Sequence, residues 1–301
     1  MPNLVLLIAC FLLGVLLRRF GRLPEETPSV LNGFVINISL PALTLLYVHE
    51  LPITRALAFP AAMAWVLFGL GFLFFLAIGR AAGWPRHTVG GLILVGSLAN
   101  TSFLGLPMIE TFYGAEHLGL GILIDQLGTY MVLSTFGIFI AITYASGDTS
   151  PAAVARKIAT FPPFQALVLA LLLKPFPYPA GAELVLGKLG ATLAPLALVS
   201  VGYQLRLAEL KGRLAALSTG LAFKLVMGPA LIMGLFAGAL GADGPTIQVT
   251  IFEAAMAPQI GASIVAMQHR LDPPLVTLMV GIGIPLSFLT LPAWWYVLLG
   301  V

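Results

Sequence analysis

The sequence has 301 residues, of which 59% are hydrophobic and only 9% are charged, and its formal net charge is +3 at pH 7. Soluble domains carry about 25% charged residues. The composition therefore excludes a soluble globular protein and predicts an all-α protein that crosses a membrane several times. No run of basic side chains is longer than Arg18-Arg19, so we expect the lipid bilayer, and no nucleic acid, as a partner.

Apolar runs bounded by charges, proline or glycine predict ten membrane-spanning helices. In chain order they cover roughly 3–17, 28–48, 56–79, 88–112, 117–145, 161–176, 181–205, 214–240, 245–268 and 274–299. The first and the sixth are only about 15 residues long, so each covers about 22 Å of a hydrocarbon core that is about 30 Å thick. Because these two short helices open the two halves of the chain, they indicate an internal repeat.

The repeat unit is predicted to contain five helices, in residues 1–145 and again in 151–301, joined by the polar connector 146–151. An odd number of helices inserts the second unit upside down, which predicts an inverted repeat. The connectors support one orientation, because basic residues gather on the side that joins helices 1–2, 3–4, 5–6, 7–8 and 9–10. The residues on that side are Arg18, Arg19, Arg22, Arg80, Arg86, Arg156, Lys157, Arg206, Lys211, Arg213 and Arg270, and only Arg55, Lys174 and Lys188 lie on the other. The positive-inside rule then places both termini outside the cytoplasm.

The predicted fourth and ninth helices are each interrupted by a polar stretch that contains proline, in residues 97–107 and 253–263. An interruption in lipid persists only where it faces protein or a cavity, because the backbone must satisfy its own hydrogen bonds. Interruptions in matching helices of two inverted repeats indicate the binding site of a secondary transporter near the bilayer midplane. The candidate substrate-binding residues are Asn100, Thr101, Ser102, Pro107, Pro258, Gln259 and Ser263, together with Ser39 and Gln204 of helices 2 and 7. Interhelical hydrogen bonding is an equally good interpretation of Ser39 and Gln204.

Three ionisable side chains, Asp125, Lys224 and Glu253, are predicted deep in the membrane. Each costs about 2.5–3.5 kcal/mol on insertion scales, which makes each a functional hypothesis. Glu253 precedes unwound carbonyls and Gln259, an oxygen cluster suited to a cation or proton; the alternative is a structural ion pair with Lys224. Asp125 and Thr129 are four residues apart and so share one face of the predicted helix. Asp125 is interpreted as an ion ligand, with hydrogen bonding between helices as the alternative.

We therefore expect Na⁺ or H⁺ as a coupling ion and no other cofactor. Lys224 is interpreted as the counter-ion of a carboxylate, with attraction of an anionic substrate or snorkelling to the interface as alternatives. The chain has no phosphate-binding Gly-Lys-Ser/Thr loop and no histidine deep in a span, so we expect neither ATP-driven transport nor an enzyme. The expected coupling residues are Asn100, Thr101, Asp125, Thr129, Lys224, Glu253, Met256 and Gln259, with Na⁺ held by Asn100, Thr101, Asp125 and Glu253.

Three stretches resemble the auxin efflux carrier family of bacteria and plants: Asn-Gly-Phe-Val-Ile-Asn-Ile-Ser-Leu-Pro-Ala-Leu at 32–43, Asn-Thr-Ser-Phe-Leu-Gly-Leu-Pro at 100–107 and Gly-Ile-Pro-Leu-Ser-Phe-Leu-Thr-Leu-Pro at 283–292. The resemblance implies the fold of bile-acid symporters and sodium/proton antiporters. In that fold helices 4 and 9 cross at their breaks inside a core domain of helices 3–5 and 8–10, and helices 1, 2, 6 and 7 form a scaffold domain through which plant relatives pair as homodimers. The chain departs from bile-acid symporters by Ala257-Pro258 before Gln259 and by the lack of glutamine in 56–79. A single cation site is therefore expected instead of two.

Together these observations predict a secondary active transporter in a bacterial cytoplasmic membrane. The expected substrate is a small organic anion such as a carboxylate, moved by symport with an elevator-type change of access. A cation/proton antiporter is the first alternative, with Asp125 and Glu253 as carriers and Lys224 as the competitor. A membrane sensor that does not transport is the second.

Overall fold

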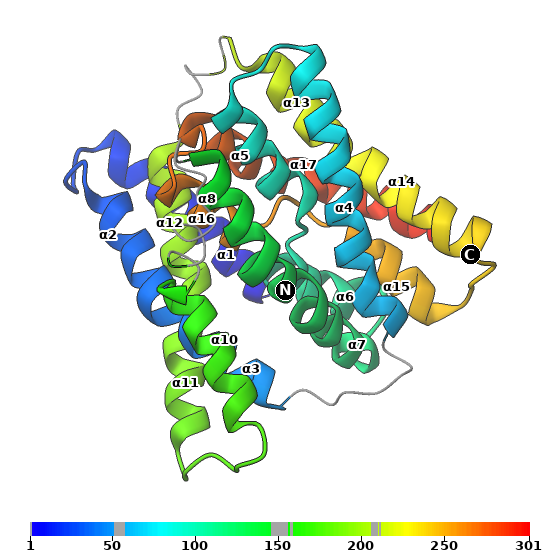
Figure 1. Ribbon diagram of the computed structural model, residues 1–301, viewed down its shortest axis with the longest axis horizontal. Helices are drawn as coiled ribbons and strands as arrows, with labels where there is room; N and C mark the ends of the chain where they lie inside the picture. Colours follow the sequence, from blue (N-terminus) through cyan, green and yellow to red (C-terminus); the bar gives the residue numbers. More distant parts are fainter. Residues whose placement is uncertain (1, 51–57, 146–155, 157–158, 206–209, 211) are drawn as a thin grey trace.

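The computed structural model describes residues 2–50, 58–145, 156, 159–205, 210 and 212–301. Within these ranges the regular structure is helical, apart from one isolated antiparallel β-bridge between Ala99 and Pro258 (Figure 1). The predicted connector 146–151 and four of the basic residues used for the orientation lie outside the described residues, namely Arg55, Lys157, Arg206 and Lys211.

The helices follow the apolar runs of the sequence. The first half contains α1 (Pro2–Arg19), α2 (Thr27–Phe34), α3 (Leu40–Glu50), α4 (Ala58–Ala81), α5 (Arg86–Ser97), α6 (Leu106–Phe112), α7 (Leu118–Leu123) and α8 (Ile138–Ala145). The second contains α10 (Pro162–Leu173), α11 (Ala182–Ala191), α12 (Leu193–Gln204), α13 (Leu214–Ala222), α14 (Gly228–Met233), α15 (Pro245–Ala254), α16 (Ile260–Gln268) and α17 (Pro273–Leu298). Wider π-helical turns join several of them: η1 (Val35–Ser39), η3 (Thr101–Gly105), η5 (Ile124–Tyr130), η6 (Leu133–Gly137), η8 (Phe223–Met227) and η9 (Gly234–Ala239).

Six helical stretches are long and apolar enough to cross a membrane, so the chain is a polytopic membrane protein. They cover 27–46, 60–81, 120–145, 182–204, 214–239 and 273–298, which correspond to the predicted helices 2, 3, 5, 7, 8 and 10. The first predicted helix is α1, with 18 residues, and the sixth is α10, with 12. The fourth and ninth are each divided, into α5 and α6 and into α15 and α16. The total of ten spans and the inverted repeat stay predictions.

The helices pack in two groups. In one group α1 and α2 lie on α12, and α3 lies on α10 and α11 (Figure 1). In the other, α4 and α8 pack on α5, and α13, α15 and α16 pack on α17. The first group corresponds to predicted helices 1, 2, 6 and 7, and the second to predicted helices 3–5 and 8–10. Their action as separate scaffold and core domains stays a prediction.

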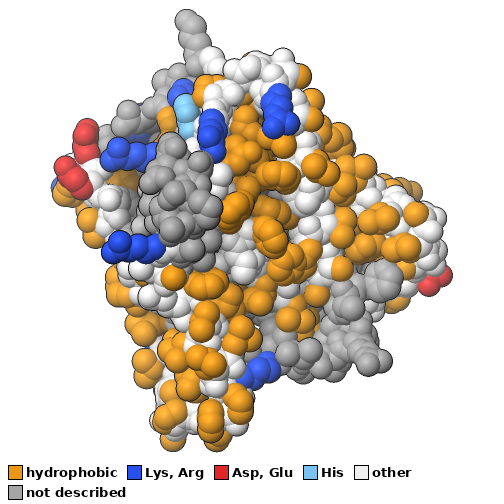
Figure 2. Space-filling model, in the orientation of Figure 1, with side chains coloured by type: hydrophobic (Ala, Val, Ile, Leu, Met, Phe, Trp, Pro, Cys, Tyr) orange, Lys and Arg blue, Asp and Glu red, His pale blue; other side chains and the backbone are white. Residues whose placement is uncertain are grey.

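Glycine allows α1 and α12 to approach closely. A Cβ on Gly14 would meet the carbonyl oxygen of Val199, and one on Gly202 would meet that of Phe11. Small residues at such contacts let helix backbones pack in a membrane, where no hydrophobic effect drives the helices together. The other face of α1 carries exposed leucine, valine and isoleucine side chains. Figure 2 shows apolar side chains across much of one face of the molecule, with most of the visible Lys and Arg side chains toward one end.

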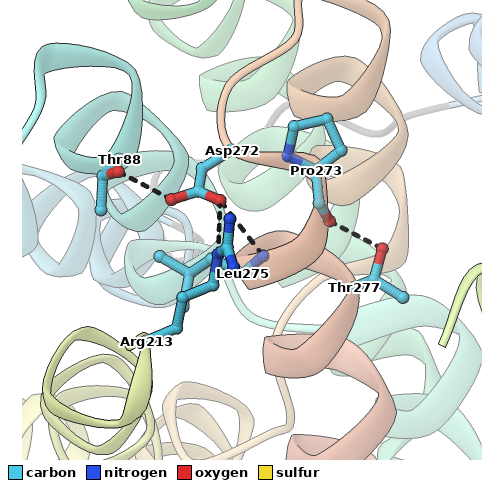
Figure 3. Close-up of polar contacts among 6 residues, drawn as sticks. All are labelled: Thr88, Arg213, Asp272, Pro273, Leu275 and Thr277. Atoms are coloured by element: carbon cyan, nitrogen blue, oxygen red, sulfur yellow. Dashed lines mark hydrogen bonds and ion pairs between the residues drawn. The ribbon is translucent and has the colours of Figure 1, made fainter. Parts of the chain in front are cut away.

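At the start of α17, Asp272 joins three helices (Figure 3). Its carboxylate accepts hydrogen bonds from the Thr88 hydroxyl of α5 at 2.7 Å and from Nε of Arg213, beside α13, at 3.1 Å. It also caps α17 by accepting from the Leu275 amide at 3.5 Å. The side chain of Asp272 is mostly buried, and its backbone is left-handed, with φ of 46°. Asp272 therefore links α5, α13 and α17 at one end of the second helix group.

Candidate functional site

The breaks in the two divided helices lie against each other. Leu98 has an extended backbone at the end of α5, and the proline of the second break, Pro258, removes one helical N–H. The Asn100 amide donates to the carbonyl of Ala257 at 2.9 Å, and the Gln259 amide donates to the carbonyl of Leu98 at 3.1 Å. Backbone groups left free by each break are thus satisfied by the other, as burial in a membrane requires.

Asp125 lies beside this crossing on the π-helical turn η5, where its side chain is buried. The Thr101 hydroxyl donates to Oδ1 of Asp125 at 2.5 Å, and Nε2 of Gln126 donates to Oδ2 at 2.7 Å. The structure therefore brings together two of the predicted cation ligands, Thr101 and Asp125. Thr129 does not join them, since its buried hydroxyl has no hydrogen-bond partner among the described residues.

A cavity of about 140 Å³ adjoins Asp125 at the boundary between the two helix groups. The second group contributes the polar side chains of Ser102, Asp125, Gln126, Tyr130 and Gln259. The first group contributes an apolar wall that includes Leu40, Leu43, Gly190 and Leu193. Oε1 of Gln259 is buried and has no hydrogen-bond partner among the described residues, so it is available to a ligand. Two of the predicted substrate-binding residues, Ser102 and Gln259, thus line one small cavity. A third, Thr101, lies next to it through its hydrogen bond to Asp125.

A larger hollow of about 850 Å³ opens along the same boundary. It is lined by Tyr203 and Gln204 at the end of α12, by Asn32 of α2 and by Met267 and Gln268 of α16. Arg18, Glu25 and Arg270 are also in its wall. The predicted orientation puts Arg18 and Arg270 on the cytoplasmic side, so we call this hollow the vestibule.

Glu253 lies on the last turn of α15 and is fully buried. Neither oxygen of its carboxylate has a hydrogen-bond partner among the described residues. The carboxylate packs against Gly105 and Gly121, where an added Cβ would lie 2.5 Å and 3.3 Å, respectively, from its nearest oxygen. Asp125 and Lys224 both lie within electrostatic range of it.

Lys224 is also fully buried, on the π-helical turn η8. Its ammonium group donates to the backbone carbonyl of Ala254 at 2.7 Å. From the sequence, a carboxylate was expected to be the direct partner of Lys224. The structure places the ammonium on the free carbonyl at the end of α15, next in sequence to the Glu253 side chain.

The remaining predicted residues surround the crossing without lining the small cavity. Asn100 caps η3 by accepting from the Leu104 amide at 3.4 Å, and it lines a separate apolar cavity of about 260 Å³. Ser263 donates to the carbonyl of Ile260 in its own helix. The others are buried: Pro107 near the start of α6, Met256 in the second break and Pro258 at the β-bridge.

Ser39 and Gln204 have different surroundings. The hydroxyl of Ser39 is bonded to that of Thr192 at 2.7 Å, which joins η1 to the start of α12. Gln204 donates to Ser200, one turn earlier on α12, and it lines the vestibule. Ser39 thus has the interhelical role that the sequence analysis kept as an alternative.

Sequence reasoning missed Gln126, Tyr130 and the π-helical turns. Tyr130 shares a hydrogen bond with Thr44 of α3, which spans the boundary between the two helix groups. Thr101, Asp125 and Lys224 all lie on π-helical turns, which are frequent at functional sites.

Two crossed helix breaks beside a cavity with polar side chains on one wall are typical of membrane transport proteins. The comparisons agree: the family described as "Membrane transport protein" matches residues 1–295, and the chain belongs to this family, the auxin efflux carrier family that its motifs resemble. An uncharacterized transporter of Methanothermobacter thermautotrophicus is 28% identical over 290 residues, which are 95% of this chain and 94% of that protein. An uncharacterized transporter of Methanocaldococcus jannaschii is 25% identical over 313 aligned positions, which cover 99% of both chains.

Proposed function

We propose that this protein is a secondary transporter that carries a small organic anion, such as a carboxylate, across the cytoplasmic membrane. The observation that carries the proposal is the polar cavity beside the crossed breaks, at the boundary between two helix groups. Secondary transporters of this kind bind their substrates at such discontinuous helices near the bilayer midplane. The side-chain amide of Gln259 and the hydroxyl of Ser102 supply hydrogen-bond donors, and the volume of about 140 Å³ favours short carboxylates.

Coupling to Na⁺ or H⁺ is proposed at Asp125. No lysine or arginine is among the described residues that line the cavity, whereas Asp125 is. An organic anion would therefore be repelled by this carboxylate unless a cation or a proton accompanied it. Thr101 and Gln126 orient the two carboxylate oxygens for that purpose.

The proposed change of access is a movement of the second helix group along the first, in the manner of an elevator. The vestibule and the small cavity lie along the same boundary, which supports entry of the substrate from the vestibule. A ligand shifts such an equilibrium only by its different affinities for the two states. A homodimer held through the first helix group is proposed as the stationary frame.

Counterflow in proteoliposomes tests the transport function. Vesicles containing the purified protein are loaded with one of several unlabelled carboxylates, from acetate to indole-3-acetate, and uptake of the same labelled compound is followed. We expect the uptake of at least one labelled compound to exceed its uptake by empty liposomes. Asp125→Asn should lower that uptake by roughly tenfold or more, which corresponds to about 1.4 kcal/mol. Asp243→Asn, at an exposed position, is the control and should transport normally.

The cation/proton antiporter remains the alternative, favoured by the two buried carboxylates of Asp125 and Glu253. The same vesicles with a pH-sensitive dye inside distinguish the two functions. Proton movement driven by Na⁺ or K⁺, with no counterflow of any carboxylate, would replace the organic-anion proposal.

A further inference from the structure

The last turn of α15 presents a backbone carbonyl to a buried cationic side chain. A helix carries negative partial charge at its C-terminus, where carbonyl groups have no helical partner. In transporters with broken helices, such carbonyls coordinate the coupling cation. Here α15 ends at Ala254, directly at the crossing, and the Ala254 carbonyl accepts a hydrogen bond from the ammonium of Lys224 at 2.7 Å.

If it is ionised, the Glu253 carboxylate next to this carbonyl requires a positive charge nearby. Glu253 is 0% exposed, and its two oxygens have no hydrogen-bond partner among the described residues. Asp125 lies within electrostatic range and adds a second negative charge to the region. An isolated buried carboxylate is strongly unfavourable, and Lys224, also 0% exposed, supplies an ammonium within electrostatic range.

We propose that the ammonium of Lys224 is a built-in cation, which occupies the break of α15 in the way that a coupling cation does in other broken-helix transporters. Na⁺ is then not needed at Glu253, and any exchangeable cation is confined to Asp125. Only the role of this cation in ion coupling rests on the proposed transport function. The occupied site itself depends on the contact between Lys224 and Ala254 and on the burial of Glu253.

Removal of the ammonium should open a site for an added cation. Lys224→Ala leaves the Ala254 carbonyl facing an empty volume that Na⁺ or methylammonium can enter, with the Glu253 carboxylate within electrostatic range. Lys224→Met removes the charge but fills the volume, so it is the matched control. Lys188→Ala, on an exposed part of α11, controls for loss of a lysine in general.

Thermal unfolding of the purified protein in detergent measures binding of the added cation, with choline keeping the ionic strength constant. We expect Lys224→Ala to be stabilised saturably by Na⁺ and by methylammonium, with the melting temperature rising on the order of 5 °C at 100-fold saturation. The wild type, Lys224→Met and Lys188→Ala should show no such rise at this site, and Lys224→Ala/Glu253→Gln should lose it. A folded Lys224→Ala that does not respond to either cation would overturn the proposal.

Two further outcomes also decide the matter. A Na⁺-specific rise in the wild type that Glu253→Gln removes and Asp125→Asn retains would place an exchangeable ion at Glu253 and refute the built-in cation. If Lys224→Ala cannot be purified, Lys224→Met is compared with Lys224→Met/Glu253→Gln. The proposal requires the double variant to melt at the higher temperature, because it no longer buries an uncompensated carboxylate; an equal or lower value contradicts it. None of these measurements uses an organic anion, so they are independent of the counterflow result.

Discussion

At the scale of single residues, glycine makes room for the buried carboxylate of Glu253. Gly105 follows the first break, and Gly121 lies on α7, and both are in contact with that carboxylate. A larger side chain at Gly105 would displace the carboxylate, whereas one at Gly121 would first meet the side chains of Ile109 and Leu106. These glycines are thus required by packing, since neither has a positive φ.

Gly105→Ala is expected to destabilise the protein. The new Cβ would lie 2.5 Å and 2.7 Å from the two carboxylate oxygens of Glu253, and overpacking of this kind costs about 1–3 kcal/mol. Thermal unfolding should show a fall of roughly 2–8 °C. Gly69→Ala in α4 is the control, because its Cβ meets nothing within 4 Å; it should be neutral or stabilising. If Gly105→Ala costs as much in a Glu253→Ala background as in the wild type, the clash is not its cause.

At the scale of helices, ends and breaks determine how the second group is held together. The Ala99–Pro258 bridge joins α5 to α16 at the crossing, and Asp272 joins α5, α13 and α17 at one end. The left-handed backbone of Asp272 is a conformation that aspartate and asparagine tolerate better than most residues. One side chain therefore provides a turn, a helix cap and an ion pair.

Variants of Asp272 separate these contributions. Asp272→Ala loses the cap, the ion pair and the residue type suited to φ of 46°, and we expect a cost of about 2–3 kcal/mol. Asp272→Asn keeps the cap and tolerates the left-handed backbone, so most of the stability should remain. Thermal unfolding of both variants beside Asp243→Ala, an exposed acid, is the measurement. Equal melting temperatures for Asp272→Ala and the wild type would show that the Arg213 and Thr88 contacts are unimportant.

At the scale of the whole molecule, two cavities share the boundary between the two helix groups. The vestibule is the larger, at about 850 Å³, and the basic residues in its wall belong to the side that the positive-inside rule places in the cytoplasm. Access to the small cavity is therefore proposed to be from the cytoplasm in this conformation. The single cysteine of the chain, the buried Cys10, makes this testable by labelling.

In a Cys10→Ala background, Ser29→Cys and Gln268→Cys place a thiol in the vestibule wall. We expect a membrane-impermeant maleimide to label both in inside-out vesicles and neither in right-side-out vesicles. Glu183→Cys, at the exposed start of α11, should show the opposite pattern and serves as the control. Labelling of the vestibule positions from outside would reverse the predicted orientation.

The helical, polytopic fold and the positions of the two breaks were predicted from the sequence because both depend on local properties. A long apolar run must form a helix in lipid to satisfy its backbone, and Pro258 and the polar residues around it interrupt that run wherever the helix packs. Membership of the family followed from contiguous motifs such as 100–107. The π-helical turn at 124–130, which carries both Asp125 and Thr129, was not predicted from the sequence.

Amino-acid order by itself thus determined that the chain crosses a membrane, where its helices break and which polar residues lie at the breaks. Only the tertiary structure decided which of those residues meet. Thr101 donates a hydrogen bond to Asp125, which lies 24 positions later in the chain. Lys224 donates one to the carbonyl of Ala254, which lies 30 positions later. The cavity also needs Leu40 and Leu193 from the other helix group. Distances between side chains on different helices depend on how all the helices pack together, and no local pattern in the chain encodes that packing.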